Sequence, residues 1–468
     1  MDHDLLEDMF VEVVAWLGAI GEEGKGDGPA ERGPDCYLAT CRTSHLWCAF
    51  ASIGLVRNMQ HDGSLTSADS KIEDAVVSPR AKSGLAADDG RLADDRKLVF
   101  IDTLRGLAIL MVILVHHSQV FSVLRPFTYP AAYGQLGVQL FFVASAFTMC
   151  MSASHRREEP HPVSSFYIRR VFRIAPLYYV GILLYFLIDS MWPFFPTVKS
   201  VYTFGNVLAN LLFVHGFVPD AYNRVVLGGW SIAAEMSFYL LFPLMYPICK
   251  QLHDKYGLIA IATLAALFVA VSAVFNLAVI PKFGESIANT NFWYCMILNQ
   301  VAVFIVGMGT YFHLQRRRFF VRFGVDAAAF VALSVLSGAF LLANAPWAMV
   351  LLPATAGLSF AFLLSVVRGF GQSRIGLVER IGQHSYSMYI FHFVFAWTIS
   401  RAILKVATSY GIPPAFTYFA TLGFTIGATY LVAKSSKVIV EDRFIEYGRR
   451  LIKARDAKWR NTGASSPA

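Results

Sequence analysis

Apolar stretches separated by short polar loops recur along the chain from Leu98 onward. Each is long enough to form a helix that crosses the hydrocarbon core of a bilayer, which takes about 20 residues. A further segment, 201–217, is shorter and contains Asn206, Asn210 and His215. The pattern predicts an all-α fold, a polytopic membrane helix bundle with about ten transmembrane helices and one re-entrant or partial helix. The predicted spans are 98–121, 132–152, 174–192, 230–248, 257–278, 294–314, 325–343, 347–367, 384–404 and 415–437.

Basic residues in alternate loops predict the orientation of this bundle. With ten spans, all the loops rich in Lys and Arg fall on one side, together with both termini, and the positive-inside rule makes that side cytoplasmic. Counting 201–217 as a full span would reverse every later loop, so we expect a re-entrant or outward-facing helix there. The residues concerned are Arg156, Arg157, Arg169, Arg170, Arg173, Lys250, Lys255, Arg316, Arg317, Arg318, Arg322, Arg368, Arg374, Arg380, Arg443, Arg449, Arg450, Lys453 and Arg455.

Composition divides the chain into three regions. Apolar residues make up 56% of it and charged residues only 15%, against about 25% charged in soluble domains. Residues 1–96 are acidic and lack sustained periodicity, so we expect a disordered extension. Residues 97–445 form the predicted transmembrane domain, and 446–468 a basic cytoplasmic tail. The basic residues lie in short loops rather than on a solvated face, which argues against nucleic-acid binding.

The sequence contains one weak candidate for a metal site. Cys36, Cys41 and Cys48 lie near His45 but lack a second spaced pair of ligands, so we predict no metal site.

Two ionisable residues lie on one face of the first predicted span. Arg105 and His116 are 11 residues apart, which brings them to within about 20° of each other around a helix and separates them by about 16 Å along it. Ionisable side chains at membrane depth are costly, so they are functional candidates by default. His117 points to another face and is the weaker candidate.

The third and fourth spans carry further charged residues. Arg170 and Arg173 share a helix face and either anchor the span at the membrane surface or bind phosphate oxygens, as arginine does bidentately. Glu235 lies inside the fourth span, and a buried carboxylate needs a partner. Counted from the ends of their spans, His116 and Glu235 both fall in the outer third, so we expect them to pair.

A polar stripe lies on the ninth predicted span. Ser385, Tyr389 and His392 follow an i, i+4, i+7 spacing next to His384. Such a stripe faces a cavity or another helix, and the spacing leaves both interpretations open.

These motifs together resemble the acyltransferase 3 family of membrane acyltransferases, from Lys97 to about Arg450. The family has an Arg and a His separated by ten residues in its first span, like Arg105 and His116. It also has an R-x-x-R pair after the second span, like that of Arg170 and Arg173.

Three further blocks carry the same resemblance. GVQLFFVASAF, residues 137–147, is similar to the family's G-V-x-x-F-F-x-x-S-G-F, with Ala146 where Gly is usual. WSIAAEMSFY resembles its W-S-x-x-x-E-x-x-F-Y block, and SYSMYIFH resembles its late Ser–Tyr–His segment. The resemblance implies O-acylation, commonly O-acetylation, of surface or exported carbohydrate, and a place in the bacterial cytoplasmic (inner) membrane.

The residues and the resemblance together predict a mechanism. Coenzyme A binds through Arg170 and Arg173, and Arg105 guides its arm inward. His116 acts as general base on the acceptor hydroxyl, with Glu235 stabilising the imidazolium; a route through acylated His116 is the alternative. Acyl-CoA, acetyl-CoA above all, is a co-substrate, and no permanently bound cofactor is expected. The residues assigned to substrate binding are Trp230, Ser231, Tyr239, Tyr389 and His392.

Two other functional classes are compatible with intramembrane charges. A proton-coupled transporter of a sugar or lipid-linked sugar would use paired Arg, His and Glu side chains, but it predicts inverted repeats, and segments 98–248 and 257–437 show no self-similarity. A membrane sensor or scaffold leaves the set of Arg105, His116 and Glu235 unexplained. The oligomeric state is not predicted.

Overall fold

The computed structural model describes residues 79–124, 130–191, 201–279, 291–370 and 376–461, with side chains from residue 99 onward. The chain forms two compact units, 1–89 and 90–468, and the membrane-spanning helices belong to the second. The described ranges are helical and contain no strand. Most of the extension predicted as disordered, residues 1–78, lies outside the described residues, and α2 begins at Pro79.

Ten helical segments among the described residues are long and apolar enough to cross a membrane, and each coincides with a predicted span. The longer elements are α2 (Pro79–Ser118), α4 (Gly137–His155), α5 (Pro162–Met191), α7 (Gly229–Tyr256), α8 (Leu258–Val274), α11 (Ile297–Leu314), α12 (Phe323–Ala343), α13 (Pro346–Gly369), α15 (Ser385–Phe393), α16 (Ser400–Ser409), α17 (Pro414–Ser436) and α18 (Asp442–Asn461). The shorter ones are α6 (Phe204–Leu211), α10 (Phe292–Cys295), α14 (Gly376–Gln383), the 3-10 turns η1 (Ser122–Leu124), η2 (Tyr133–Leu136) and η3 (His215–Phe217), and the π-helical segments η4 (Phe275–Val279), η6 (Val394–Ile399) and η7 (Lys437–Glu441).

The prediction of a partial helix at 201–217 is confirmed. The segment folds into the eight residues of α6 and the turn η3, neither of which could span a membrane. Tyr178 of α5 donates a hydrogen bond to Asn210 (2.7 Å), and the Nε2 atom of His215 lies 3.0 Å from the carbonyl oxygen of Gly229. One face of the segment, with Asn210 and His215, is thus buried against α5 and the start of α7, while Phe204 and Leu212 on its other face are exposed.

Helix α11 is the centre of one group of helices. It packs against α4, α7, α8 and α13, and its residues are buried around almost the whole circumference. Helix α12 lies outside α13, and its apolar side chains Val331, Val335 and Leu342 are 58%, 68% and 82% exposed. A helix that is apolar all round and buried belongs in a core, whereas one with this exposed apolar face suits contact with lipid.

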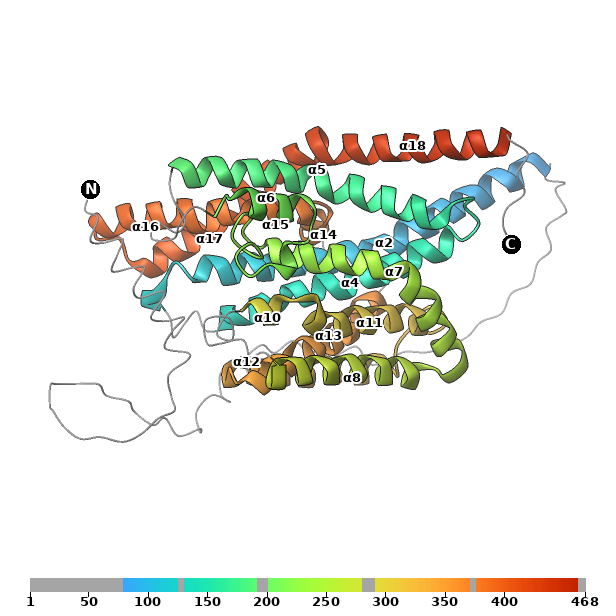
Figure 1. Ribbon diagram of the computed structural model, residues 1–468, viewed down its shortest axis with the longest axis horizontal. Helices are drawn as coiled ribbons and strands as arrows, with labels where there is room; N and C mark the ends of the chain where they lie inside the picture. Colours follow the sequence, from blue (N-terminus) through green and yellow to red (C-terminus); the bar gives the residue numbers. More distant parts are fainter. Residues whose placement is uncertain (1–78, 125–129, 192–200, 280–290, 371–375, 462–468) are drawn as a thin grey trace, which may run out of the picture. The chain divides into compact units, whose positions relative to one another are not determined.

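A second group of helices lies on the other side of α2. Helix α15 packs against α5 and α17, and α18 packs against α5. Figure 1 shows α8, α11, α12 and α13 in the lower part of the view and α5, α15 and α18 in the upper part, with α2, α4 and α7 between them. Helix α2 bonds to both sides, through Arg105 to α4 and through His117 to α17.

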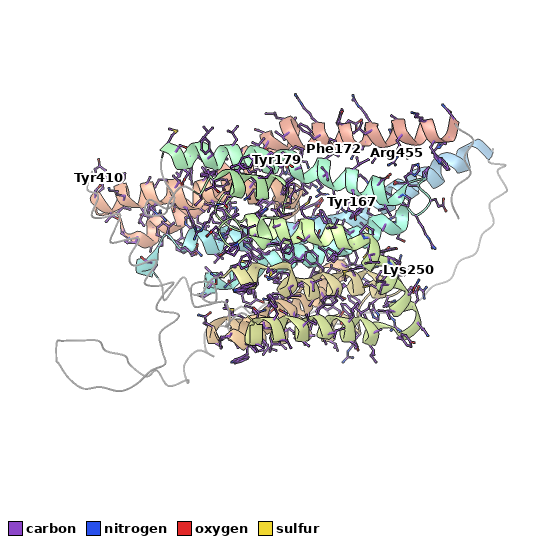
Figure 2. All side chains as sticks on the ribbon, in the orientation of Figure 1. Tyr167, Phe172, Tyr179, Lys250, Tyr410 and Arg455 are labelled. Atoms are coloured by element: carbon purple, nitrogen blue, oxygen red, sulfur yellow. The ribbon has the colours of Figure 1, made fainter. Side chains whose placement is uncertain are left out.

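The two ends of the bundle differ in charge. Figure 2 places Lys250 and Arg455 at one end and Tyr410 at the other; we call these the basic end and the opposite end. Helix α2 runs from the basic end towards the opposite end, and α7 runs the other way. The charges are thus arranged as the positive-inside rule requires of a cytoplasmic face, and that orientation remains an expectation.

The last span and the predicted basic tail form one continuous helical stretch from Pro414 to Asn461. The boundary expected after residue 445 falls inside α18. The guanidinium of Arg455 donates hydrogen bonds of 2.5 Å to the hydroxyls of both Ser164 and Ser165 at the start of α5. The tail is therefore fastened along α5.

We predict that Gly382→Ala destabilises the fold, because a Cβ atom there would lie 1.7 Å from the carbonyl oxygen of Asp102 in α2. Backbone cannot yield as a flexible side chain can, and overpacking typically costs about 1–3 kcal/mol. Thermal unfolding of the detergent-solubilised protein measures the effect. Gly427→Ala in α17 is the matched control, since no atom lies within 4 Å of its added Cβ. Equal unfolding temperatures for the two variants would contradict the prediction.

Candidate active site

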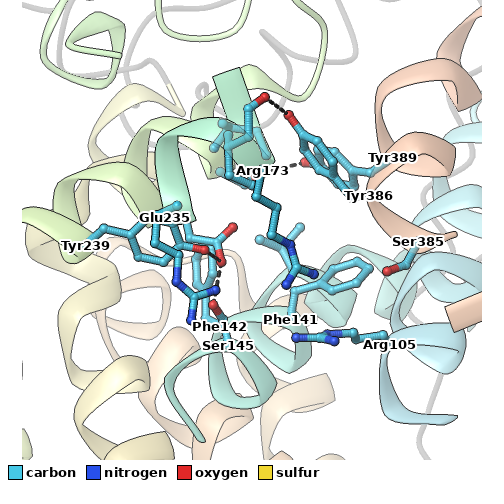
Figure 3. A pocket seen from close by; sticks show the side chains of 15 residues that line it. Arg105, Phe141, Phe142, Ser145, Arg173, Glu235, Tyr239, Ser385, Tyr386 and Tyr389 are labelled. Carbon is cyan, nitrogen blue, oxygen red and sulfur yellow. Dashed lines mark hydrogen bonds between the residues drawn. The ribbon is translucent and has the colours of Figure 1, made fainter. Parts of the chain in front are cut away.

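One pocket collects most of the residues singled out from the sequence. It is lined by side chains of α2, α4, α5, α7 and α15. Figure 3 shows Arg105, Arg173 and Glu235 pointing towards the same space from three of these helices. Seven of the predicted residues line it: Arg105, Arg170, Arg173, Ser231, Glu235, Tyr239 and Tyr389. His116, Trp230 and His392 lie outside its lining.

The arginines of α5 differ in their partners. Arg169 forms a bidentate pair with Glu159, with hydrogen bonds of 3.1 and 2.9 Å. Arg170 and Arg173 form no hydrogen bond or ion pair with the described residues. The Arg170 guanidinium instead lies over the ring of Tyr239, 5.2 Å from its centroid, a cation–π contact that leaves the N–H donors of the group available. Two arginines with free donors on one pocket wall make a site for an anion.

Glu235 does not pair with His116, which corrects the sequence-based expectation. Its carboxylate accepts hydrogen bonds from the Ser145 hydroxyl and from the Tyr239 hydroxyl, the latter 2.5 Å long. Glu235 thus holds the ring on which Arg170 rests.

The expected pairing of Glu235 with His116 was wrong because the depth of Glu235 in the membrane was counted from the first residue of the apolar segment. Helix α7 begins at Gly229, which is already buried inside the bundle next to Tyr178 and His215. Six residues further on, Glu235 therefore reaches Ser145 on α4. Ser145 is one turn from Thr148, the partner of Arg105, so Glu235 lies at the depth of Arg105 rather than that of His116.

Arg105 is held from two sides. Its guanidinium donates a 3.4 Å hydrogen bond to the Thr148 hydroxyl and lies 3.6 Å from the Asp102 carboxylate. Asp102 is three residues earlier on α2, which is the spacing of neighbours on one helix face. Asp102 partly compensates the positive charge of Arg105. The Arg105 side chain nevertheless remains part of the pocket lining.

Tyr389 joins the pocket to the start of α7. Its hydroxyl donates to the carbonyl oxygen of Gly228 at 3.0 Å and lies 2.7 Å from the Ser231 hydroxyl. Gly228 has φ +78°, a left-handed conformation that favours glycine, and a Cβ atom there would lie 3.1 Å from the Tyr389 hydroxyl. Ser231 and Tyr389 are therefore held in contact by backbone geometry.

His116 and His392 form a pair of their own towards the opposite end. The Nδ1 atom of His116 lies 2.8 Å from the Val112 carbonyl oxygen and 3.1 Å from Nε2 of His392. The Nδ1 atom of His392 lies 2.7 Å from the Tyr389 carbonyl oxygen. A carbonyl can only accept, so both Nδ1 atoms carry the proton. Neutral His392 then presents the lone pair of Nε2 to His116.

This arrangement leaves Nε2 of His116 unprotonated. It has no hydrogen-bond partner among the described residues, and the side chain is half-buried. His117 is the contrary case: its Nε2 bonds to the Tyr418 carbonyl oxygen at 3.1 Å and its Nδ1 to the Ser400 hydroxyl at 3.4 Å. Of the two neighbouring histidines, His116 is the one arranged to take up a proton.

The pocket and the histidine pair are linked through α15. Tyr389 lines the pocket, and its ring centroid lies 5.5 Å from that of His392. Trp230, at the start of α7, makes an edge contact with Phe142 of the pocket lining and a tilted ring contact with Tyr294, which lies outside that lining.

Sequence reasoning missed the small polar partners of these groups. Ser145 and Thr148 lie in α4, and their hydroxyls hold Glu235 and Arg105. Glu441 lies beyond the last predicted span, 415–437, yet it is buried and accepts a hydrogen bond from Ser387 of α15. The only signal for Ser145 was its place in the GVQLFFVASAF block, and Glu441 gave none.

Within the described ranges no group of three or more His, Cys, Asp or Glu side chains could hold a metal ion. The cysteines at 36, 41 and 48 lie outside those ranges.

Two characterised proteins are similar to this chain. Acyltransferase MdmB of Streptomyces mycarofaciens is 25% identical over 285 residues, which cover 56% of this chain and 68% of that protein. The exopolysaccharide production protein ExoZ of Rhizobium meliloti is 26% identical over 313 residues, covering 64% of this chain and 88% of that protein. No solved structure matches significantly. Neither relative is named as a transporter, so the comparisons lend that alternative no support.

A family model described as an acyltransferase domain matches residues 98–434, which is most of the chain and nearly all of the predicted transmembrane domain. The match begins before Arg105 and extends beyond His392, so it includes both the pocket and the histidine pair. The chain therefore belongs to the acyltransferase 3 family and is a membrane-embedded O-acyltransferase.

Proposed function

We propose that this protein transfers an acyl group, acetyl in the first place, from cytoplasmic acyl-CoA to a hydroxyl of a surface or exported carbohydrate, in the inner membrane of a bacterium. The observation that carries the proposal is the pairing of two sites. One is a pocket whose Arg170 and Arg173 have free N–H donors; the other is a histidine, His116, with an unprotonated Nε2. Tyr389 lies between them.

The arginines suit the acyl donor. Coenzyme A carries a diphosphate and a further phosphate, and guanidinium groups bind phosphate oxygens bidentately. Arg105, on α2, lines the same pocket from another helix, and its positive charge attracts the donor further in. From Arg105 to His116 the distance along α2 is about 16 Å, so the thioester at the end of the long pantetheine arm is the part that approaches the histidine.

His116 acts on the acceptor. Its Nε2 takes the proton of the carbohydrate hydroxyl while the hydroxyl oxygen attacks the carbonyl carbon of the thioester. The C–S bond breaks, and the coenzyme A thiolate takes the proton from Nε2, which restores the neutral ring. In the alternative route His116 is acylated first, and label would then remain on the protein in the absence of acceptor.

The acceptor class rests on the relative and on the aromatic residues at the start of α7. ExoZ is named for exopolysaccharide production, which favours a carbohydrate. Trp230 with Tyr294 offers aromatic faces beside the polar Ser231 and Tyr389, a combination of apolar surface and hydrogen-bonding groups that suits a sugar ring.

We predict that the purified protein moves radiolabel from acetyl-CoA to a carbohydrate acceptor and that His116→Ala lowers kcat by about 10²–10⁴-fold, the usual contribution of a general base. The acceptor in this assay is surface polysaccharide extracted from cells that lack the gene for this protein. His155→Ala is the matched control, since His155 is exposed at the end of α4. Label that never leaves the thioester would refute the proposed function, and full activity of His116→Ala would refute its assignment.

We predict that Arg170→Lys and Arg173→Lys each raise the KM for acyl-CoA at least fivefold, on the order of 1 kcal/mol, with kcat within about twofold. Lysine keeps the charge but cannot form a bidentate contact. Arg169→Lys controls for the charge of α5, because Arg169 is paired with Glu159 outside the pocket. Unchanged KM values for the pocket variants would remove the phosphate site.

We predict that Glu235→Gln acts on donor binding rather than on the chemical step. A charged acceptor makes a stronger hydrogen bond than a neutral one by about 1 kcal/mol, and Glu235 holds Tyr239 beneath Arg170. The KM for acyl-CoA is expected to rise about fivefold. Glu446→Gln, in an exposed ion pair of α18, is the control. A hundredfold loss of kcat with unchanged KM would contradict this role and would assign Glu235 to the chemical step.

A further inference from the structure

His116 has no carboxylate partner, although a histidine that takes up a proton in an apolar site needs a group to stabilise the charged ring. The carboxylate expected in that role, Glu235, is bonded to Ser145 and Tyr239. Within the described residues no carboxylate is hydrogen-bonded to His116 or to His392. Nδ1 of His116 instead faces two acceptors, the Val112 carbonyl oxygen at 2.8 Å and Nε2 of a second imidazole, His392, at 3.1 Å.

His392 is rigidly placed. Its side chain is fully buried, and its Nδ1–H is committed to the Tyr389 carbonyl oxygen. The two rings are inclined at 44°, with centroids 5.1 Å apart. The Phe393 ring lies 4.2 Å from each of them and excludes water from that side. With its own proton fixed on Nδ1, His392 can offer His116 only an acceptor.

A π-helical segment completes the arrangement. It follows the α15 helix directly as η6, and Trp397 within it donates a 3.0 Å hydrogen bond to the carbonyl oxygen of His116. Wider turns of this kind are rare and occur mostly at functional sites. They change the direction of the side chains that follow, and here the indole holds the α2 backbone at the residue whose ring His392 faces.

We propose that His392 is a positioning residue that takes the place of the carboxylate in a catalytic triad. This inference rests on the function proposed above. As Nε2 of His116 receives the proton of the acceptor hydroxyl, the Nδ1–H of His116, which the Val112 carbonyl oxygen and Nε2 of His392 share as acceptors, moves towards Nε2 of His392, so that one positive charge is shared by two rings. When the coenzyme A thiolate recovers the proton from Nε2, the shared proton returns to Nδ1 and both rings are neutral.

Two substitutions separate this role from simple packing. His392→Gln places an amide oxygen at about the position of Nε2 and keeps an acceptor for His116, whereas His392→Phe keeps a ring of similar size without an acceptor. We expect kcat of the Gln variant to exceed that of the Phe variant at least tenfold, with the KM for acyl-CoA within twofold of wild type in both. Equal kcat values for the two variants, or a Phe variant as active as wild type, would overturn the proposal.

Separate controls test whether the variants are folded and whether the wild-type protein has the proposed activity. Gel filtration and thermal unfolding show whether the Phe variant is folded. If wild type itself fails to transfer label from acetyl-CoA, the proposed function fails; if wild type is active and the His392 variants match it, only this inference fails.

A second measurement needs no Phe variant. Single-turnover rates are recorded in mixtures of light and heavy water for wild type and for His392→Gln. Two protons in motion give a curved dependence of rate on deuterium fraction in wild type, and the Gln variant, which cannot accept a proton, gives a straight line. A straight line for wild type would refute the transfer between the two rings.

Discussion

Within a hydrocarbon medium a polar group that lacks a partner costs several kcal/mol, because no water is present to replace the bond. In this bundle the same cost distinguishes residues whose polar groups are bonded within the protein from residues that can bond to a ligand. Arg169, Glu235 and His117 have their partners inside the protein. Arg170 and Arg173, together with Nε2 of His116, have no hydrogen-bond partner among the described residues. These two places, an anion site on α5 and a proton acceptor on α2, are where the described part of the protein leaves bonds open to a ligand.

The spans could be predicted because each is a property of one local stretch of sequence. Hydropathy and loop charge act over about 20 residues, and they identified all ten segments as well as the partial helix at 201–217. The pocket residues were predictable for a related reason, since a charge in an apolar run stands out. Even the face shared by Arg105 and His116 follows from helix periodicity alone.

Pairing between helices could not be predicted in the same way. Whether Glu235 meets His116 depends on where α7 begins within the bundle, and that depends on the packing of 201–217 against Tyr178. The partners Ser145 and Thr148 give no signal because hydroxyls in membrane helices commonly bond to their own backbone, as Thr148 also does to Ala144. Depth and partner choice are tertiary properties.

The stretch from Pro414 to Asn461 connects the two halves of the site. At one end it lies against α2, where Tyr418 accepts a hydrogen bond from His117. At the other end, Arg455 is hydrogen-bonded to Ser164 and Ser165 in the first turn of α5, the helix that carries Arg170 and Arg173. One helical stretch thus reaches from beside His117 to the first turn of α5, the helix that lines the pocket with Arg170 and Arg173. Because this stretch is bonded at both ends, a shift of the first turn of α5 would be transmitted towards the histidines, so the pocket and the histidine pair are mechanically coupled.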